Sequence, residues 1–136
     1  MSDFREQLHI LKQRATPARL AVLEALEHTR QPLSIDGIIR AVHGRRIDLV
    51  TIYRTVTLLK KIGLVRQVDF QHGHAHYELS SLGDHHHVVC VKCDSVADIP
   101  HRNATSMMNT ALVESGFARI TDHCMEFFGV CKKCAV

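Results

Sequence analysis

The hydrophobic positions in the first half of the chain follow a helical period. Apolar residues recur three or four positions apart, which predicts helices over 3–13, 17–28, 34–42 and 49–62. Residues 64–70 and 75–79 then show a strand pattern on either side of a turn, which predicts a β-hairpin. Short helices followed by a hairpin are typical of a winged helix-turn-helix, whose last helix enters the DNA major groove.

The second half alternates between strand and helix patterns. Residues 88–91, 95–99, 117–120 and 125–130 predict strands, and residues 102–115 predict a helix that Gly116 ends. The short stretch at 80–84 predicts a hinge. We therefore expect an α+β protein with a winged-helix domain at 1–80, a hinge at 81–84 and an α/β domain at 85–136.

The chain lacks the features of a membrane or secreted protein. No apolar run approaches the roughly 20 residues that a bilayer-spanning helix needs. The first residues, Met1 to Glu6, lack the basic-then-apolar layout of a signal peptide. We expect a cytoplasmic protein without a membrane partner.

Charge divides the chain in two. Residues 1–68 hold twelve Lys and Arg against six Asp and Glu, a net +6, whereas residues 69–136 hold five against eight, a net −3. A basic half fits a nucleic-acid partner, although solvated helix surfaces explain the charge equally well. The predicted helix at 49–62 offers polar side chains for base and phosphate contacts, namely Thr51, Tyr53, Arg54 and Thr55. The alternative is a polar helix face that touches nothing.

Two Cys-x-x-Cys pairs are the most specific chemical signal. Cys90 with Cys93, and Cys131 with Cys134, each place two sulfurs on a tight turn, and four thiolates form the closed tetrahedral site that structural zinc prefers. Neighbouring lysines are expected to ease thiolate formation. A redox dithiol would need only one pair, and a zinc deaminase would need a His-x-Glu motif that the sequence lacks.

Residues 69–87 concentrate histidine and carboxylate side chains. In a strand, His74, His76 and Glu78 share one side, and His85 shares a side with His87. This mixed ligand set suits zinc, ferrous iron, manganese or nickel. The alternative is a solvated histidine-rich loop.

Several motifs occur together in one order: Thr16-Pro17-Ala18-Arg19, Thr51-Ile52-Tyr53-Arg54-Thr55-Val56, Gly63-Leu64-Val65, Tyr77-Glu78-Leu79, the stretch His85 to Cys93, and Cys131-Lys132-Lys133-Cys134. With this combination the chain resembles the ferric uptake regulator family over nearly its whole length. The resemblance implies a DNA-binding domain, a hinge and a dimerisation domain. It also implies a homodimer that binds a palindromic operator when a regulatory metal is present.

The resemblance assigns roles to particular positions. Tyr53 and Arg54 correspond to recognition-helix contacts, Arg14 to a basic residue that reaches the minor groove, and Arg19 is a further DNA-binding candidate. The metal positions comprise the four cysteines for structural zinc and Glu78, His85 and His87 for the regulatory ion. Weaker metal candidates are Asp98, at a position that some peroxide sensors use, and His86 and His123, part of a further site in the dimerisation domain.

The chain departs from the family pattern at two places. The loop Gln31–Ser34 lacks the histidine of many iron and peroxide sensors, so Asp69, His76 or His74 is expected to complete the regulatory site. Thr105 stands where the further site needs a carboxylate. The absence of the loop histidine and the presence of Asp69 favour zinc as the regulatory ion. Glu78, which stands in place of a thiol, favours iron or manganese.

These patterns predict a metal-responsive transcriptional repressor that controls metal uptake and homeostasis. Its expected cofactors are a structural Zn²⁺ and a regulatory Zn²⁺, Fe²⁺ or Mn²⁺. The alternatives are a repressor that senses peroxide through ferrous iron and histidine oxidation, a zinc-dependent enzyme and a metal buffer that does not bind DNA. We expect no enzymatic activity, because no general base accompanies an open zinc site.

Overall fold

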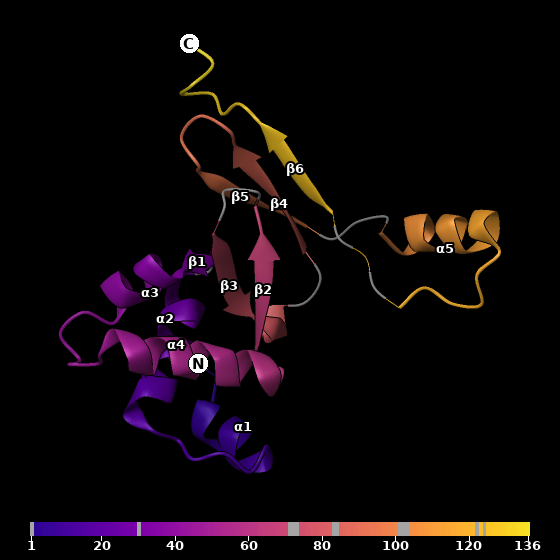
Figure 1. Ribbon diagram of the computed structural model, residues 1–136. Coiled ribbons are helices and arrows are strands. Elements are labelled where there is room, and N and C mark those ends of the chain that lie inside the picture. Colours follow the sequence, from indigo (N-terminus) through magenta and orange to yellow (C-terminus); the bar gives the residue numbers. More distant parts are fainter. Residues whose placement is uncertain are drawn as a thin grey trace. The chain divides into compact units, whose positions relative to one another are not determined.

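The computed structural model describes residues 2–29, 31–70, 74–82, 85–100, 104–121, 123 and 125–136. The chain divides into two compact units, Met1–Leu82 and Gly83–Val136 (Figure 1). The division falls inside the stretch 81–84 where the hinge was expected.

The described residues of the N-terminal unit form four α-helices and a small sheet. The helices are α1 (Phe4–Ile10), α2 (Pro17–Thr29), α3 (Ile35–Ala41) and α4 (Leu49–Lys61). Strands β2 (Val65–Asp69) and β3 (Ala75–Leu79) form the antiparallel hairpin of the wing (Figure 1). The two-residue strand β1 (Leu33–Ser34), which the sequence did not predict, adds to β3 and gives the order β1-β3-β2. A 3-10 turn, η1 (Ser80–Leu82), follows β3.

The helices of this unit surround one apolar core. Leu23 and Leu26 of α2 meet Ile52 and Leu59 of α4, and all four side chains are at most 1% exposed. Burial of a side chain of this size contributes about 1.5–3 kcal/mol to stability. The core therefore fixes which face of α4 points inward and which remains available to a partner.

Local hydrogen bonds set the two ends of α4. Asp48 is the N-cap, and its Oδ1 accepts a hydrogen bond from the backbone N–H of Thr51 at 2.7 Å. Hydrogen bonds from the Thr51 side chain and then from its backbone lower the pKa of Asp48 below its usual value. At the other end, Gly63 has φ +85° and stops the helix, because few other residues adopt that conformation.

We expect Asp48→Ala to fray the first turn of α4, lower the melting temperature of the N-terminal unit and weaken DNA binding. Asp48→Asn keeps an acceptor and should retain most of the cap at neutral pH. In the folded protein the pKa of Asp48 lies below its ordinary value of about 3.8. The negative charge of Asp48 therefore stabilises the fold above that ordinary value, and this contribution is lost as pH falls through the pKa of the folded state. Circular dichroism melts between pH 3 and 7 check this: acid should reduce the advantage of wild type over Asp48→Asn, and a constant difference would contradict it.

In the C-terminal unit, the residues that the structure describes form a three-stranded sheet and one helix. Strand β4 (His85–Cys90) lies at the centre, antiparallel to β5 (Val96–Pro100) and parallel to β6 (Glu126–Gly129). Helix α5 (Ala104–Ser115) lies between β5 and β6 along the chain (Figure 1). The α+β fold class is confirmed. Strand β4 begins three residues before the predicted start because the histidines at 85–87 also pair with β5.

One predicted element is wrong. Residues 117–120 do not form a strand. Gly116 has φ +70° after α5, and the backbone N–H of Phe117 donates to Ser115 Oγ at 3.2 Å, so the chain turns instead of extending. Phe117 is 69% exposed, and its apolar side chain packs on no core that would hold a strand there. Within the described part of the chain, we find no helix with the length and apolarity to cross a membrane.

Candidate metal centres and nucleic-acid interface

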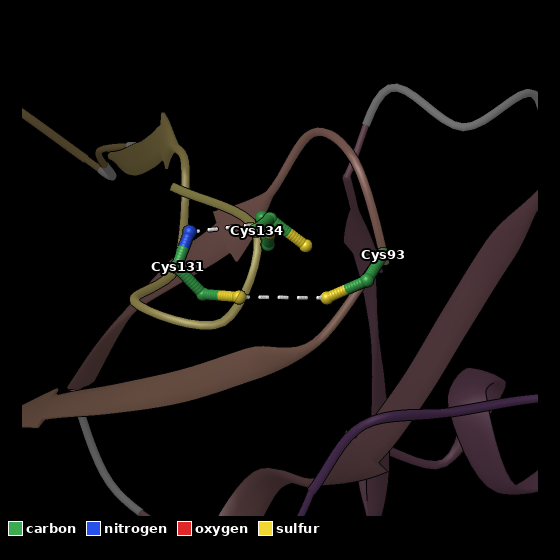
Figure 2. A group of neighbouring side chains, drawn as sticks. Cys93, Cys131 and Cys134 are labelled. Carbon is green, nitrogen blue, oxygen red and sulfur yellow. Dashed lines mark hydrogen bonds between the residues drawn. The ribbon is translucent and has the colours of Figure 1, made fainter. Parts of the chain in front are cut away.

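Strand pairing brings the two cysteine pairs together. Cys90 ends β4 and Cys93 lies in the following turn, while Cys131 and Cys134 follow β6, which is the parallel neighbour of β4. The backbone N–H of Val91 donates to Gly129 O at 2.8 Å, which extends the alignment of the strands to the two knuckles. The four sulfurs lie within 4.8 Å of one another, and those of Cys93 and Cys131 are 3.7 Å apart (Figure 2).

This spacing fits one tetrahedral zinc ion. With Zn–S bonds of about 2.3 Å, two sulfurs of a tetrahedron lie about 3.8 Å apart. The separation between Cys93 and Cys131 already matches that value. The four thiols therefore form a preorganised site for an ion held entirely by sulfur.

Backbone amide groups and neighbouring sulfurs shift the pKa values of the cysteine thiols. The N–H groups of Cys131, Cys93 and Lys92 point at the sulfur of Cys90 and lower the pKa of that thiol to about 6. Contact with the Cys131 and Cys93 sulfurs raises the pKa of Cys134 to about 12. The thiolate of Cys90 thus owes its stability to hydrogen bonding rather than to the lysine side chains that the sequence suggested. With its raised pKa, the Cys134 thiol keeps its proton at neutral pH in the absence of an ion, so zinc binding must release that proton.

One face of the C-terminal sheet carries a second ligand set. His87 lies at the centre of β4, opposite Asp98 of β5 and Glu126 of β6. Its Nε2 is 3.7 Å from Asp98 Oδ1, and its ring is 4.7 Å from that of His85, centre to centre. His87 is 1% exposed, whereas the Asp98 side chain is 45% exposed. The imidazoles of His85 and His87 and the carboxylate of Asp98 therefore lie close together on this face, and such groups bind divalent metals.

The wing of the N-terminal unit holds the other regulatory candidates. Strand alternation in β3 places His76 and Glu78 on one face, and the ring of His74, which precedes the strand, lies 4.9 Å from that of His76. Glu78 is 2% exposed and pairs with Arg66 Nε at 2.7 Å. Asp69 is in register with Ala75, so it points to the opposite face of the hairpin from His76 and Glu78. Within the wing, His76 rather than Asp69 therefore shares a face with Glu78.

The further-site candidates lie on the other face of β4. His86 alternates with His85 and His87, so it points away from them. Its ring lies 5.5 Å from that of His123, and its Nδ1 is 3.2 Å from the backbone oxygen of Met125. The two histidines come together, but nothing is described of the side chain of Thr105.

Helix α4 presents one face to solvent. Ile52, Val56 and Leu59 point into the core, while Tyr53 is 52% exposed and Arg54 is exposed. Thr55 is only 6% exposed, because it lies on the same helical face as Ile52 and Leu59. The suggestion that Thr55 contacts DNA is therefore wrong for this conformation. Thr51 remains accessible, although its side chain also bonds to the Asp48 cap.

A second basic group lies where the loop after α1 meets the first turn of α2. Arg14 is exposed. Arg19 Nη1 donates to the backbone oxygen of Arg14 at 2.8 Å and approaches Gln13 Oε1 at 3.5 Å. Arg19 therefore holds the loop that presents Arg14 in shape, as well as adding positive charge to it.

Comparison with known proteins agrees with this arrangement. A sequence profile of the ferric uptake regulator family matches residues 11–128. The ferric uptake regulation protein of Neisseria meningitidis is 35% identical over 125 residues, which cover 89% of this chain and 85% of that protein.

Two solved structures resemble the chain over nearly its whole length. The ferric uptake regulator from Pseudomonas aeruginosa with manganese superposes with a TM-score of 0.78 at 26% identity, covering 96% of this chain and 99% of that one. The Campylobacter jejuni peroxide stress regulator gives a TM-score of 0.73 at 27% identity, covering 98% and 100%. The match to the family profile over residues 11–128 and the 35% identity to the Neisseria meningitidis protein show that the chain belongs to the ferric uptake regulator family.

Proposed function

We propose that the protein is a metal-responsive transcriptional repressor that binds a palindromic operator as a homodimer. The observation that carries the proposal is the presence of two chemically distinct ligand sets on one small sheet. Four thiolates would hold a structural zinc ion permanently through Cys90, Cys93, Cys131 and Cys134. The imidazole and carboxylate groups around His87 would exchange a divalent ion with the surroundings.

The proposed regulatory site uses residues from both sides of the hinge. Glu78 lies near the end of β3, seven residues before His85, and β4 begins with His85 and contains His87. An ion bound by all three, with His76 or Asp69 and with Asp98 as further candidate ligands, would restrain the short connection between the two units. The bound ion would thus favour one arrangement of the two recognition helices of a dimer, because a ligand stabilises the state it binds best.

Exposed apolar side chains of the C-terminal unit support the dimer. Met107 and Val113 of α5 are 54% and 80% exposed, and Phe127 and Phe128 of β6 are 46% and 39% exposed. Extensive apolar exposure on a small unit marks a surface that a partner covers. A second copy of this chain would cover these residues and place two α4 helices on two operator half-sites.

Three divalent ions are candidates for the regulatory site, and a binding experiment distinguishes among them. Manganese is named for the Pseudomonas aeruginosa relative, and ferric uptake for the Neisseria meningitidis relative. The residues around His87 are nitrogen and oxygen donors, which suit Mn²⁺, Fe²⁺ and Zn²⁺ alike. We propose a cytoplasmic regulator without enzymatic activity, whose specificity among these ions follows from the ligands that complete the site.

The test begins with DNA sequences selected from a random duplex pool by the zinc-loaded protein in the presence of Mn²⁺. Fluorescence anisotropy then measures binding of the selected duplex with Mn²⁺, Fe²⁺, Zn²⁺ or no added ion. Coupling between two sites typically changes affinity about 5–150-fold. We expect a change of this size with at least one ion, and failure to select any DNA would contradict the proposal.

Arg54→Ala is expected to weaken binding of the selected duplex about 5–150-fold, because an arginine contact to a guanine edge contributes about 1–3 kcal/mol. Binding of the regulatory ion should not change. Arg119→Ala is the matched control: it removes the same charge from an exposed position of the C-terminal unit. Equal DNA affinity for the Arg54 and Arg119 variants would refute a recognition role for α4.

Peroxide sensing is a second candidate, favoured by the contact between His87 and Asp98 and by the likeness to the peroxide stress regulator. In this function, His85 and His87 would hold ferrous iron, peroxide would be the oxidant that supplies one oxygen atom to one of these rings and leaves as water, and the oxidised ring would no longer hold the ion that supports DNA binding. Mass spectrometry of the iron-loaded protein after peroxide treatment checks this. Unmodified peptides containing both histidines would reject peroxide sensing and leave the repressor function standing.

A further inference from the structure

Glu126 makes close polar contacts with His87. Its Oε2 lies 3.0 Å and its Oε1 3.2 Å from His87 Nδ1. The same Oε2 accepts the backbone N–H of His87 at 3.1 Å. The side chain of Glu126 is 13% exposed, and that of His87 is 1% exposed. This carboxylate is therefore held beside one particular nitrogen of a buried ring.

The contact dictates how the ring carries its proton. A carboxylate accepts hydrogen bonds and donates none, so a neutral His87 must place its N–H at Nδ1. The lone pair is then at Nε2, the nitrogen that faces Asp98 at 3.7 Å. An imidazole binds a metal through its lone pair, so Nε2 becomes the ligand atom, on the side of the ring where Asp98 lies.

We infer that Glu126 is a positioning residue for the regulatory metal, acting through His87 as an outer-sphere carboxylate. The inference rests on the proposed function, in which His87 is a ligand. Carboxylates that accept the second N–H of a metal-bound histidine fix its orientation and increase its basicity, and their loss typically costs about 10–100-fold in metal affinity. Because both of its oxygens are engaged on the Nδ1 side of the ring, Glu126 is placed to orient His87 rather than to bind the ion.

The decisive variant is Glu126→Gln, which preserves size and removes the negative charge. Glu114→Gln is the matched control, since it makes the same charge change at an exposed position of α5. Zinc-loaded proteins are titrated with Co²⁺, and visible absorption reports both affinity and coordination. We expect Glu126→Gln to bind cobalt about 10–100-fold more weakly than wild type with an unchanged spectrum, and Glu114→Gln to match wild type.

Different results separate this inference from the proposed function. If wild-type protein binds no cobalt beyond its zinc cluster, the regulatory site itself is absent. If wild type binds cobalt and Glu126→Gln binds it equally well, only the role of Glu126 is refuted. A changed cobalt spectrum in Glu126→Gln would also refute it, because that result makes Glu126 a ligand.

A second measurement does not depend on metal binding. Long-range ¹H–¹⁵N NMR spectra distinguish the two neutral forms of an imidazole ring. With the zinc cluster loaded and no regulatory ion, we expect His87 to carry its proton on Nδ1 in wild type and to lose this preference in Glu126→Leu. Retention of zinc by the variant shows that the unit is folded, and an unchanged proton position would overturn the inference.

Discussion

Replacing Cys131 with serine is expected to abolish zinc binding and to unfold the C-terminal unit, while the N-terminal unit stays folded. The described part of the C-terminal unit buries few apolar side chains, with Val89 and Cys90 the fully enclosed ones. Zinc binding by thiolates supplies about 10–16 kcal/mol at neutral pH, and that energy is coupled to folding. The N-terminal unit has its own core of leucine, isoleucine and valine side chains.

Thermal unfolding followed by circular dichroism, together with zinc analysis and sedimentation, measures this effect. The variant should lack zinc, lose dimers and retain the helical transition of the N-terminal unit. Cys124→Ser is the control, because Cys124 lies outside both Cys-x-x-Cys pairs and outside the described residues. A zinc-free Cys131→Ser protein that dimerises and melts like wild type would show that the ion has no structural role.

The second large effect is expected from His85→Ala. Removing a ligand should reduce regulatory-metal affinity by more than the roughly 10–100-fold loss expected for an outer-sphere partner. DNA binding should then no longer respond to the ion, and the zinc content should stay unchanged because the cysteine cluster is a separate site. Isothermal titration of zinc-loaded protein with Mn²⁺, followed by DNA-binding assays, measures both quantities.

His86→Gln is the matched control for that experiment. His86 adjoins His85 in the sequence but lies on the opposite face of β4. It should respond to the regulatory metal like wild type. If loss of His86 abolished the response and loss of His85 preserved it, the regulatory ion would belong to the opposite face of the sheet, beside His123.

Helices and sites could be predicted from the sequence wherever several local signals agree. Helix α4 was predictable because Asp48 and Gly63 mark its ends and its apolar positions have a helical period. The cysteine cluster was predictable because each pair is itself a local motif. The burial of Thr55 was also recoverable, since it stands three residues after Ile52 and four before Leu59 on one helical face.

The contribution of Glu126 was not predictable from local patterns. It meets His87 only because β6 pairs in parallel with β4, across 39 residues of sequence. No short motif marks such a pair, and Glu126 resembles an ordinary polar residue of an edge strand. The face of the hairpin on which Asp69 lies was not predictable either, because it depends on the register of β2 and β3 rather than on the composition of the loop.

The proposed regulation requires that one regulatory ion and operator DNA bind the protein in a coupled way. Coupling is reciprocal, so DNA must raise the affinity for the ion by the same factor as the ion raises the affinity for DNA. The most direct test is a Mn²⁺ titration of zinc-loaded protein with and without the selected duplex. We predict that the duplex tightens metal binding about 5–150-fold in wild type and not in His85→Ala. Equal metal affinity of the wild type with and without DNA would contradict the account.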